Sequence, residues 1–150
     1  MCEISIEGFL PRFLGISRRS IAQASAFFAK RSGERIGVPF RSVAVVLQRD
    51  AASARVHEAI NGVSGATDVV TQRYDPMPGE EPGVYGEIYV NCDQALRAAP
   101  RKAIWSPAKE LLLYVAHGFD HLSGADDLEE KDRLRMRRRE LSWIRRLEGR

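Results

Sequence analysis

The sequence predicts a single α/β (α+β) domain, in which a mixed sheet of about four strands is packed by about five helices. Its length of 150 residues suits one domain with a core of its own. Its composition, 44% hydrophobic and 29% charged, is that of an ordinary folded chain. Short stretches with strand patterning alternate with longer stretches with helical patterning. That order gives a sheet covered by helices, and no repeat or second domain is indicated over residues 1–150.

The chain opens with a strand and a helix. Residues 2–6 alternate polar and apolar side chains, as a strand with one buried face does. Ser17 can cap the helix, because its hydroxyl can accept a backbone N–H of the first turn. Apolar residues recur on one face up to about Arg31, and Ser32-Gly33 is expected to end the helix.

The middle of the chain predicts three strands and two short helices. The uninterrupted apolar run in residues 41–48 is typical of a buried strand. Asp50 can then cap a helix that Asn61-Gly62 ends. Strands are expected at residues 67–74 and 84–91, and the proline-rich stretch between them is expected to be a loop. Asp93 can start a second short helix, which would end near Ala99.

The last third predicts two long helices. Residues 100–107 are expected to connect to a helix that ends near Leu122, and a second helix is expected from Lys131 to Arg150. At about 100° per residue, the first of these helices has an apolar side opposite His117 and His121. Leu113 and Tyr114 flank the histidines, so a lined cleft is expected there rather than open solvent. The apolar side consists of Ala108, Leu111, Leu112, Val115, Phe119 and Leu122.

A short histidine motif carries the strongest chemical signal. His117 and His121 are four residues apart, so a helix places both imidazoles on one face, one turn apart. Two such histidines can bind one metal ion, as in the His-x-x-x-His helices of zinc enzymes. Gly124 can end the helix, after which Asp126 or Asp127 can return as a third ligand. A tripod of this kind leaves a coordination position open for water, which is typical of a hydrolytic site.

Two other interpretations of the motif stay open. The histidines can be a surface or hydrogen-bonded pair that holds no metal. The aspartates can instead begin the next helix, because Asp127-x-x-Glu130 has the spacing of a capping box. The remaining histidine, His57, lies on the helix after Asp50 and is expected to be solvent-facing or at the edge of the core.

The motif resembles the signature of the YbeY family of endoribonucleases, the bacterial rRNA maturation factors. In that family the pattern is His-Gly-x-x-His-Leu-x-Gly-x-Asp-His, and its three histidines hold a zinc ion. Two upstream blocks are also similar to the family, namely Thr67-Asp68-Val69 and Gly86-Glu87-Ile88. In order and spacing the resemblance covers roughly residues 40–147. It implies one Zn²⁺ per chain, with His117, His121 and Asp127 as its ligands and the two histidines as catalytic residues.

The sequence departs from the family pattern at two functional positions. The family's third histidine aligns with Asp127, a carboxylate that zinc also accepts. The family's arginine before the Thr-Asp-Val block, which acts on phosphate, falls near Asn61. Arg55 or Arg73 is a candidate to replace it at the RNA phosphate.

The C-terminal segment supplies a second signal, its positive charge. Residues 131–150 contain nine basic and three acidic residues, a net charge of +6, whereas the whole chain carries +3. Concentrated arginine favours phosphate contacts and fast association with nucleic acid. Arg137 and Arg138 are the candidates for RNA binding here, although a solvated helix face would carry the same pattern.

Three further features of the sequence predict where the protein is located in the cell. No apolar run approaches the roughly 20 residues needed to span a bilayer, and the first residues lack the pattern of a signal peptide. Cys2 and Cys92 are isolated and are expected to be reduced. We therefore expect a cytoplasmic protein with no membrane partner; the sequence leaves its oligomeric state open.

These observations favour a metal-dependent, single-strand-specific endoribonuclease. The family resemblance implies rRNA as substrate, in 16S rRNA 3′-end processing and ribosome biogenesis and quality control, and the small ribosomal subunit as partner. Zinc peptidases place a glutamate directly after the first histidine, and Gly118 stands there instead. The alternatives are a noncatalytic RNA- or ribosome-binding assembly factor with a degenerate metal site, and a metal-dependent hydrolase of another substrate.

Overall fold

A computed structural model describes residues 1–101 and 105–149, and it confirms the predicted α/β class. The described residues form a four-stranded mixed sheet, five α-helices and two short 3-10 helices, at Arg12–Leu14 and Ala99–Arg101. The sheet has the order β1-β2-β4-β3. Its first three members are parallel to one another and β3 is antiparallel to β4. The strands are β1 Glu3–Glu7, β2 Phe40–Gln48, β3 Val69–Tyr74 and β4 Val84–Asn91.

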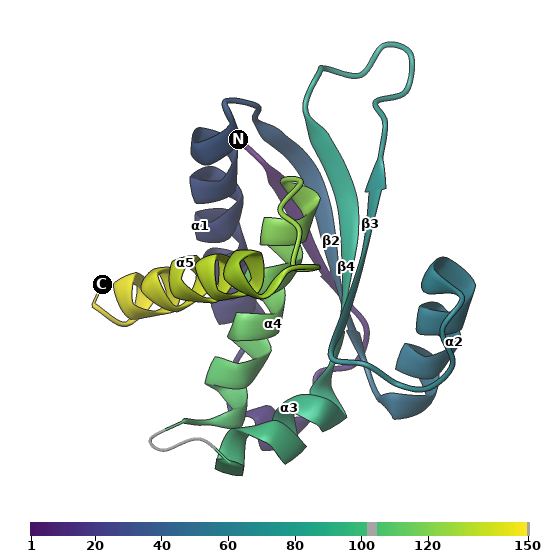
Figure 1. The fold of residues 1–150 in the computed structure, drawn as a ribbon, viewed down its shortest axis with the longest axis vertical. Helices are drawn as coiled ribbons and strands as arrows, with labels where there is room; N and C mark the ends of the chain where they lie inside the picture. Colours follow the sequence, from purple (N-terminus) through teal and green to yellow (C-terminus); the bar gives the residue numbers. More distant parts are fainter. Residues whose placement is uncertain (102–104, 150) are drawn as a thin grey trace.

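The helices divide between the two sides of the sheet (Figure 1). On one side lie α1, α4 and α5, with α5 crossing over α4, and on the other side lies α2. The short α3 lies below the sheet in this view. Among the described helices, none combines the length and apolarity that a membrane crossing requires. The helices are α1 Arg18–Ile36, α2 Asp50–Asn61, α3 Cys92–Ala98, α4 Pro107–Leu122 and α5 Glu130–Glu148.

The core lies between the sheet and the α1–α4–α5 layer. Alternate residues of β2 and β4, such as Val45 and Ile88, are fully buried on this side. Aromatic rings from four elements, α1, β2, α4 and α5, meet in this core, where the centroids of Phe28 and Trp143 are 5.8 Å apart. Phe119 packs against both Phe28 and Phe40. The central helix α4 therefore has a rigid support on the side away from its histidines.

The close approach of α4 to the sheet depends on two glycines. A Cβ atom at Gly118 would lie 2.4 Å from Cγ2 of Ile88. A Cβ atom at Gly86 would lie 2.8 Å from Cδ2 of Leu122. Cβ atoms do not approach other heavy atoms this closely in proteins. Glycine at these two positions therefore lets the helix and β4 lie so close together.

The prediction that α1 ends at Ser32-Gly33 was wrong. The helix continues to Ile36 and ends at Gly37, whose φ of 71° and N–H bond to the carbonyl of Gly33 form the stop. Gly33 lies within the helix and does not end it. A larger residue would be crowded at this position, since a Cβ there would lie 3.1 Å from the carbonyl oxygen of Val38. The glycine makes room for the chain that returns to β2.

Several predicted boundaries also shift. The carboxylate of Asp50 does not cap α2, since it accepts hydrogen bonds from Arg97 and Asn91 instead. The Asp50 N–H donates to the carboxylate of Asp93 at 2.9 Å. Strand β3 begins at Val69 rather than at residue 67. Helix α3 begins at Cys92 under a side-chain cap from Asn91. Part of the predicted 100–107 connection, and Arg150 of the predicted last helix, lie outside the described residues.

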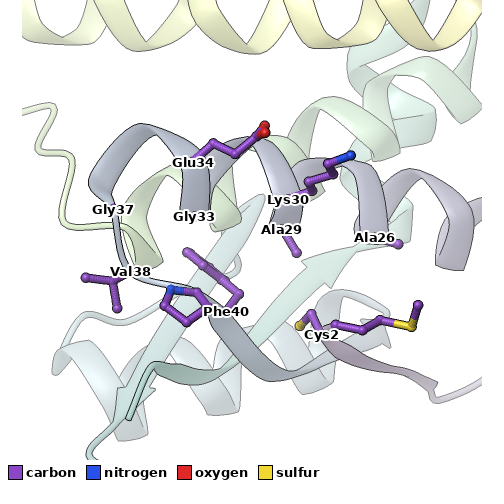
Figure 2. Close-up of a pocket in the computed structure, with 11 residues that line it drawn as sticks. Cys2, Ala26, Ala29, Lys30, Gly33, Glu34, Gly37, Val38 and Phe40 are labelled. Atoms are coloured by element: carbon purple, nitrogen blue, oxygen red, sulfur yellow. The ribbon is translucent and has the colours of Figure 1, made fainter.

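The two flanks of α1 differ in character. Toward β1 and β2 the helix borders a hollow of about 610 Å³ (Figure 2), lined largely by apolar or small residues such as Cys2, Ala29 and Phe40. The side chains of Lys30 and Glu34 point away from these residues and toward the yellow α5. Lys30 and Glu34 therefore lie on the α5 side of this helix.

Candidate metal site

The two motif histidines of α4 face one another. The Nε2 atoms of His117 and His121 are 2.9 Å apart, and their rings are nearly perpendicular at 86°. Both side chains are about a quarter exposed, at 24% and 27%. The predicted pairing of these residues on one face of a helix is thus present in the structure, at the edge of the core.

The other nitrogen of each ring fixes its orientation. Nδ1 of His117 lies 2.8 Å from Oε2 of Glu140, and Nδ1 of His121 lies 3.2 Å from the backbone carbonyl oxygen of Ala125. A carbonyl can only accept, so His121 donates from Nδ1 and presents Nε2 as an acceptor. With the same tautomer, His117 also presents a lone pair on Nε2, and the lone pairs of the two Nε2 atoms are directed at one point between the rings. A cation or a proton between them is needed to stabilise this arrangement.

The turn after α4 brings Asp127 back to the histidines. Gly124 has a φ of 94° and donates its N–H to the carbonyl of His121 at 2.9 Å, as predicted for the helix stop. Oδ2 of Asp127 then lies 3.5 Å from both Nε2 atoms. Bonds of 2.0–2.2 Å in a tetrahedral zinc site place ligand atoms about 3.3 Å apart. The three distances between the donor atoms, 2.9, 3.5 and 3.5 Å, are close to that spacing.

The capping-box alternative for the aspartates was wrong. Helix α5 is preceded by Glu129, whose side chain makes no capping hydrogen bond. Asp126 instead accepts the N–H of Leu128 at 2.7 Å, which tightens the turn. Of the two aspartates, only Asp127 faces the histidines. The local turn, rather than the start of α5, decides their roles.

Glu140 is the functional residue that sequence reasoning missed. It comes from α5, 23 residues after His117, and only 1% of its surface is exposed. Burial raises its pKa to about 7, although the hydrogen bond with His117 opposes that shift. Burial also lowers the pKa of His117, but the hydrogen bond and charge of Glu140 outweigh it, so the net shift is upward. The feature of the sequence that could have identified Glu140 is its position among apolar residues of α5. Met136, Trp143 and Ile144 are each one helical turn away, so Glu140 lies on the buried face.

A second buried carboxylate holds the end of α4. Asp120 is fully buried and accepts two hydrogen bonds from Arg139 of α5, at 2.9 and 3.1 Å. Arg35 of α1 lies 3.4 Å from the same carboxylate and also donates to the hydroxyl of Ser123. Three helices are therefore joined one residue before His121.

Comparison with known proteins then decides the family. A family model described as Endoribonuclease YbeY matches residues 17–148. The chain belongs to the endoribonuclease YbeY family. This match extends well before the region 40–147 in which the sequence resemblance was noted.

Individual YbeY relatives agree with the family model. The chain is 30% identical over 137 residues to the endoribonuclease YbeY of Anaeromyxobacter sp. (strain Fw109-5), a match that covers 90% of this chain and 67% of that protein. It is 34% identical over 131 residues to the endoribonuclease YbeY of Rhodopirellula baltica, covering 86% and 63%. The chain thus spans about two thirds of the length of these relatives. The solution structure of TM1509 from Thermotoga maritima has the same fold, with a TM-score of 0.58 at 23% identity over 97% of this chain and 89% of that one.

The four arginines predicted to contact RNA lie at different places in this YbeY-family structure. Arg73 projects from β3 toward α4 and donates to the carbonyl of Leu122 at 3.0 Å. The positive charge of Arg137 acts on Tyr114, one turn before His117, where burial raises the pKa of the phenol and Arg137 opposes that shift. Arg138 is exposed on α5. Arg55 is exposed on α2, on the opposite side of the sheet from α4, so the structure does not bring it to the histidines (Figure 1).

Two further residues of α2, Asn61 and His57, lie away from the histidine motif. Asn61, near the position of the family's arginine, is the last residue of the helix and is exposed. His57 lies with Nδ1 2.9 Å from the carbonyl oxygen of Gly65, where its ring can donate to the loop that follows α2. Neither residue faces the motif of α4.

Proposed function

We propose that this YbeY-family chain is a metal-dependent endoribonuclease that cleaves single-stranded RNA. The observation that supports it most is the convergence of three donor atoms, from His117, His121 and Asp127, with both imidazoles held by hydrogen bonds from behind. We propose these three residues as ligands of one Zn²⁺ per chain. We further propose rRNA maturation at the 16S 3′ end, on the small ribosomal subunit and in the cytoplasm, as the setting, by extension from the family.

The charges of the site suit a divalent cation. Asp127 contributes one negative charge to the ligand set, and Glu140 contributes a second behind His117 when it is ionised. Together they would balance the two positive charges of the ion, while the neutral imidazoles supply the other bonds. A zinc ion held there would supply Lewis acidity toward a phosphoryl oxygen and a water of lowered pKa.

The chain's own groups would bind and orient the RNA. Glu140 holds the ring of His117 in the orientation and tautomer that the site requires. We propose that Arg73, which bonds Leu122 at the end of α4, and Arg137, whose charge acts on Tyr114, neutralise phosphate charge, and that Arg138 and Arg55 make outer contacts. A ribose 2′-hydroxyl can act as the internal nucleophile, so a general-base glutamate after the first histidine is not required. Such a glutamate has no room here, because any Cβ at Gly118 would clash with Ile88.

Metal analysis and an RNA cleavage assay test this function. We expect purified protein to bind one zinc ion and to cut a labelled single-stranded RNA faster than the corresponding duplex. His117→Ala and Asp127→Ala should lose both metal binding and cleavage. His57→Ala is the matched control, since it removes an imidazole that hydrogen-bonds to the loop after α2 and lies away from the α4 motif, and it should retain both.

A noncatalytic assembly factor is the second candidate, because of Asp127 and Asn61. It would bind RNA or the small ribosomal subunit without cleaving RNA, even when zinc or manganese is added. That outcome would remove the enzyme proposal and leave the binding function. Cleavage that persists in His117→Ala would instead show that the reaction takes place elsewhere.

A further inference from the structure

We propose that the groove between α1 and α5 binds the sugar-phosphate backbone of single-stranded RNA, at a surface separate from the histidine site. The inference rests on the proposed RNA substrate and adds to it a second contact region. None of the four arginines proposed above as RNA contacts belongs to this groove.

One wall of the groove is a stripe of α5. Arg135, Arg139, Ser142 and Arg146 follow one another at i, i+4, i+7 and i+11, so they lie along one face of the helix. At 1.5 Å per residue this stripe is about 16 Å long. A run of this length can contact several successive phosphates of an extended strand.

The other wall is the charged flank of α1. A pocket of about 470 Å³ is lined by Arg31, Glu34 and Arg35 of α1 and by Arg139, Ser142 and Trp143 of α5. A neighbouring hollow of about 740 Å³ shares Arg31 and Glu34 and continues past Lys30 toward Leu147. The two hollows therefore adjoin one another along this flank of α1.

Positive charge is concentrated along the groove. Four cationic side chains and one acidic side chain are among the residues that line the two hollows, and Arg135 and Arg146 continue the same face of α5. The lining cations are Lys30, Arg31, Arg35 and Arg139, and the lining acid is Glu34. Concentrated positive charge of this kind attracts a polyanion.

The central arginines have more donors than their carboxylate can use. Arg35 and Arg139 share the single buried carboxylate of Asp120. Within the described part of the chain, every recorded contact of Arg35 is made by Nη2. Among the described residues, Arg31 has one long ion pair, with Nη1 3.9 Å from Oε1 of Glu34. The remaining guanidinium N–H groups are suited to phosphate oxygens, which accept two parallel hydrogen bonds from one arginine.

The shape of the surface favours a nucleic acid strand over a membrane. A groove between two helices admits a flexible sugar-phosphate chain, whereas a flat lipid surface would contact only its rims. Arg139 faces the groove and the adjacent Glu140 faces His117, so the groove and the histidine site lie on two flanks of α5. A strand bound in the groove can therefore extend around the helix toward the histidines.

Salt-dependent RNA binding by surface variants tests the groove. We would measure the anisotropy of a labelled oligouridylate in chelator, so that the metal contributes nothing to the signal. Arg31→Ala, Arg146→Ala and their double variant remove groove charges without touching Asp120. Each lost phosphate contact should lower the slope of log affinity against log salt by about 0.7. Arg12→Ala is the control, because it removes the same charge from an exposed turn beside α3 and α4 and should leave the slope unchanged.

The outcomes separate this inference from the proposed function. If both groove variants keep the wild-type slope while the wild-type protein binds and cleaves RNA, the groove is not the binding surface and the enzyme proposal stands. If the slopes fall as expected but no variant or wild-type protein cleaves RNA, the groove is confirmed and the catalytic proposal fails. Binding of vesicles rich in phosphatidylserine that falls in the groove variants, with RNA binding unaffected, would assign the surface to lipid and overturn the inference. Unchanged unfolding temperatures would exclude misfolding as the cause.

Discussion

The Oε2 atom of Glu140 lies 2.8 Å from Nδ1 of His117, and this contact joins α5 to the histidine motif of α4. It aligns one imidazole so that its second nitrogen faces that of His121. Metal-binding histidines commonly have such a carboxylate behind them, because it fixes the ring and raises its basicity. The partner comes from a different helix, so the candidate metal site is complete only when α5 has packed on α4.

Replacing Glu140 by glutamine should therefore weaken metal binding. The amide keeps the size of the side chain but removes its charge, and loss of such a partner typically costs about 10- to 100-fold in affinity. Competition for zinc with a chromophoric chelator would measure the change. Glu130→Gln, an exposed change at the start of the same helix, should bind zinc like the wild type. Equal affinities in the two variants would show that Glu140 plays no part in the site.

Gly118→Ala should destabilise the fold, because the new methyl group would lie 2.4 Å from Cγ2 of Ile88. Overpacking of this kind costs about 1–3 kcal/mol of the free energy of unfolding. Urea denaturation would measure it. Adding Ile88→Ala removes the clashing atoms, so the double variant should lose less stability than the sum of the two single variants. Strict additivity would mean that the helix and strand do not meet at this contact.

Arg139→Ala should be far more costly than Arg138→Ala. The first leaves the fully buried Asp120 with Arg35 as its remaining ionic partner, and breaking a buried pair costs about 3 kcal/mol or more. Arg138 is exposed on the same turn of α5, and surface changes usually stay within about 0.5 kcal/mol. Chemical denaturation would measure the free energy of unfolding of both variants. Each variant loses one positive charge, so a difference between them does not come from net charge. Similar unfolding free energies would contradict the buried pairing.

Asp50 should make the protein sensitive to acid. Hydrogen bonds from Arg97, and then from Asn91, lower the pKa of its carboxyl to about 2, below the value of about 3.9 in an unfolded chain. Since the folded pKa is the lower one, the stabilisation is fully present above the unfolded value and is lost as the pH falls through about 2. Asp50→Asn should lack this part of the acid dependence, which unfolding curves at successive pH values would show. Arg97→Ala should reproduce the effect, and identical acid limbs in wild type and Asp50→Asn would rule it out.

Much of the architecture was predictable from local patterns. The apolar run in β2 predicted a buried strand, and the alternating and helical stretches predicted the class. Misplaced boundaries came from residues whose roles are set by contacts outside their own helical turn. Gly33 makes room for the backbone at Val38 rather than ending α1, and the Asp50 carboxylate pairs with Arg97 rather than capping its own helix. Residue type alone carries no information about such neighbours.

The sequence by itself determined that His117 and His121 share a helix face and that Gly124 reverses the chain, because helical spacing and the freedom of glycine are local properties. Tertiary structure alone decided that Asp127 rather than Asp126 faces the histidines, that Glu140 lies behind one ring, and that Arg35 meets Arg139 across a buried carboxylate. These contacts join residues of separate elements. Their formation depends on how α1, α4 and α5 pack, which is set by the summed burial of the core and not by any one segment.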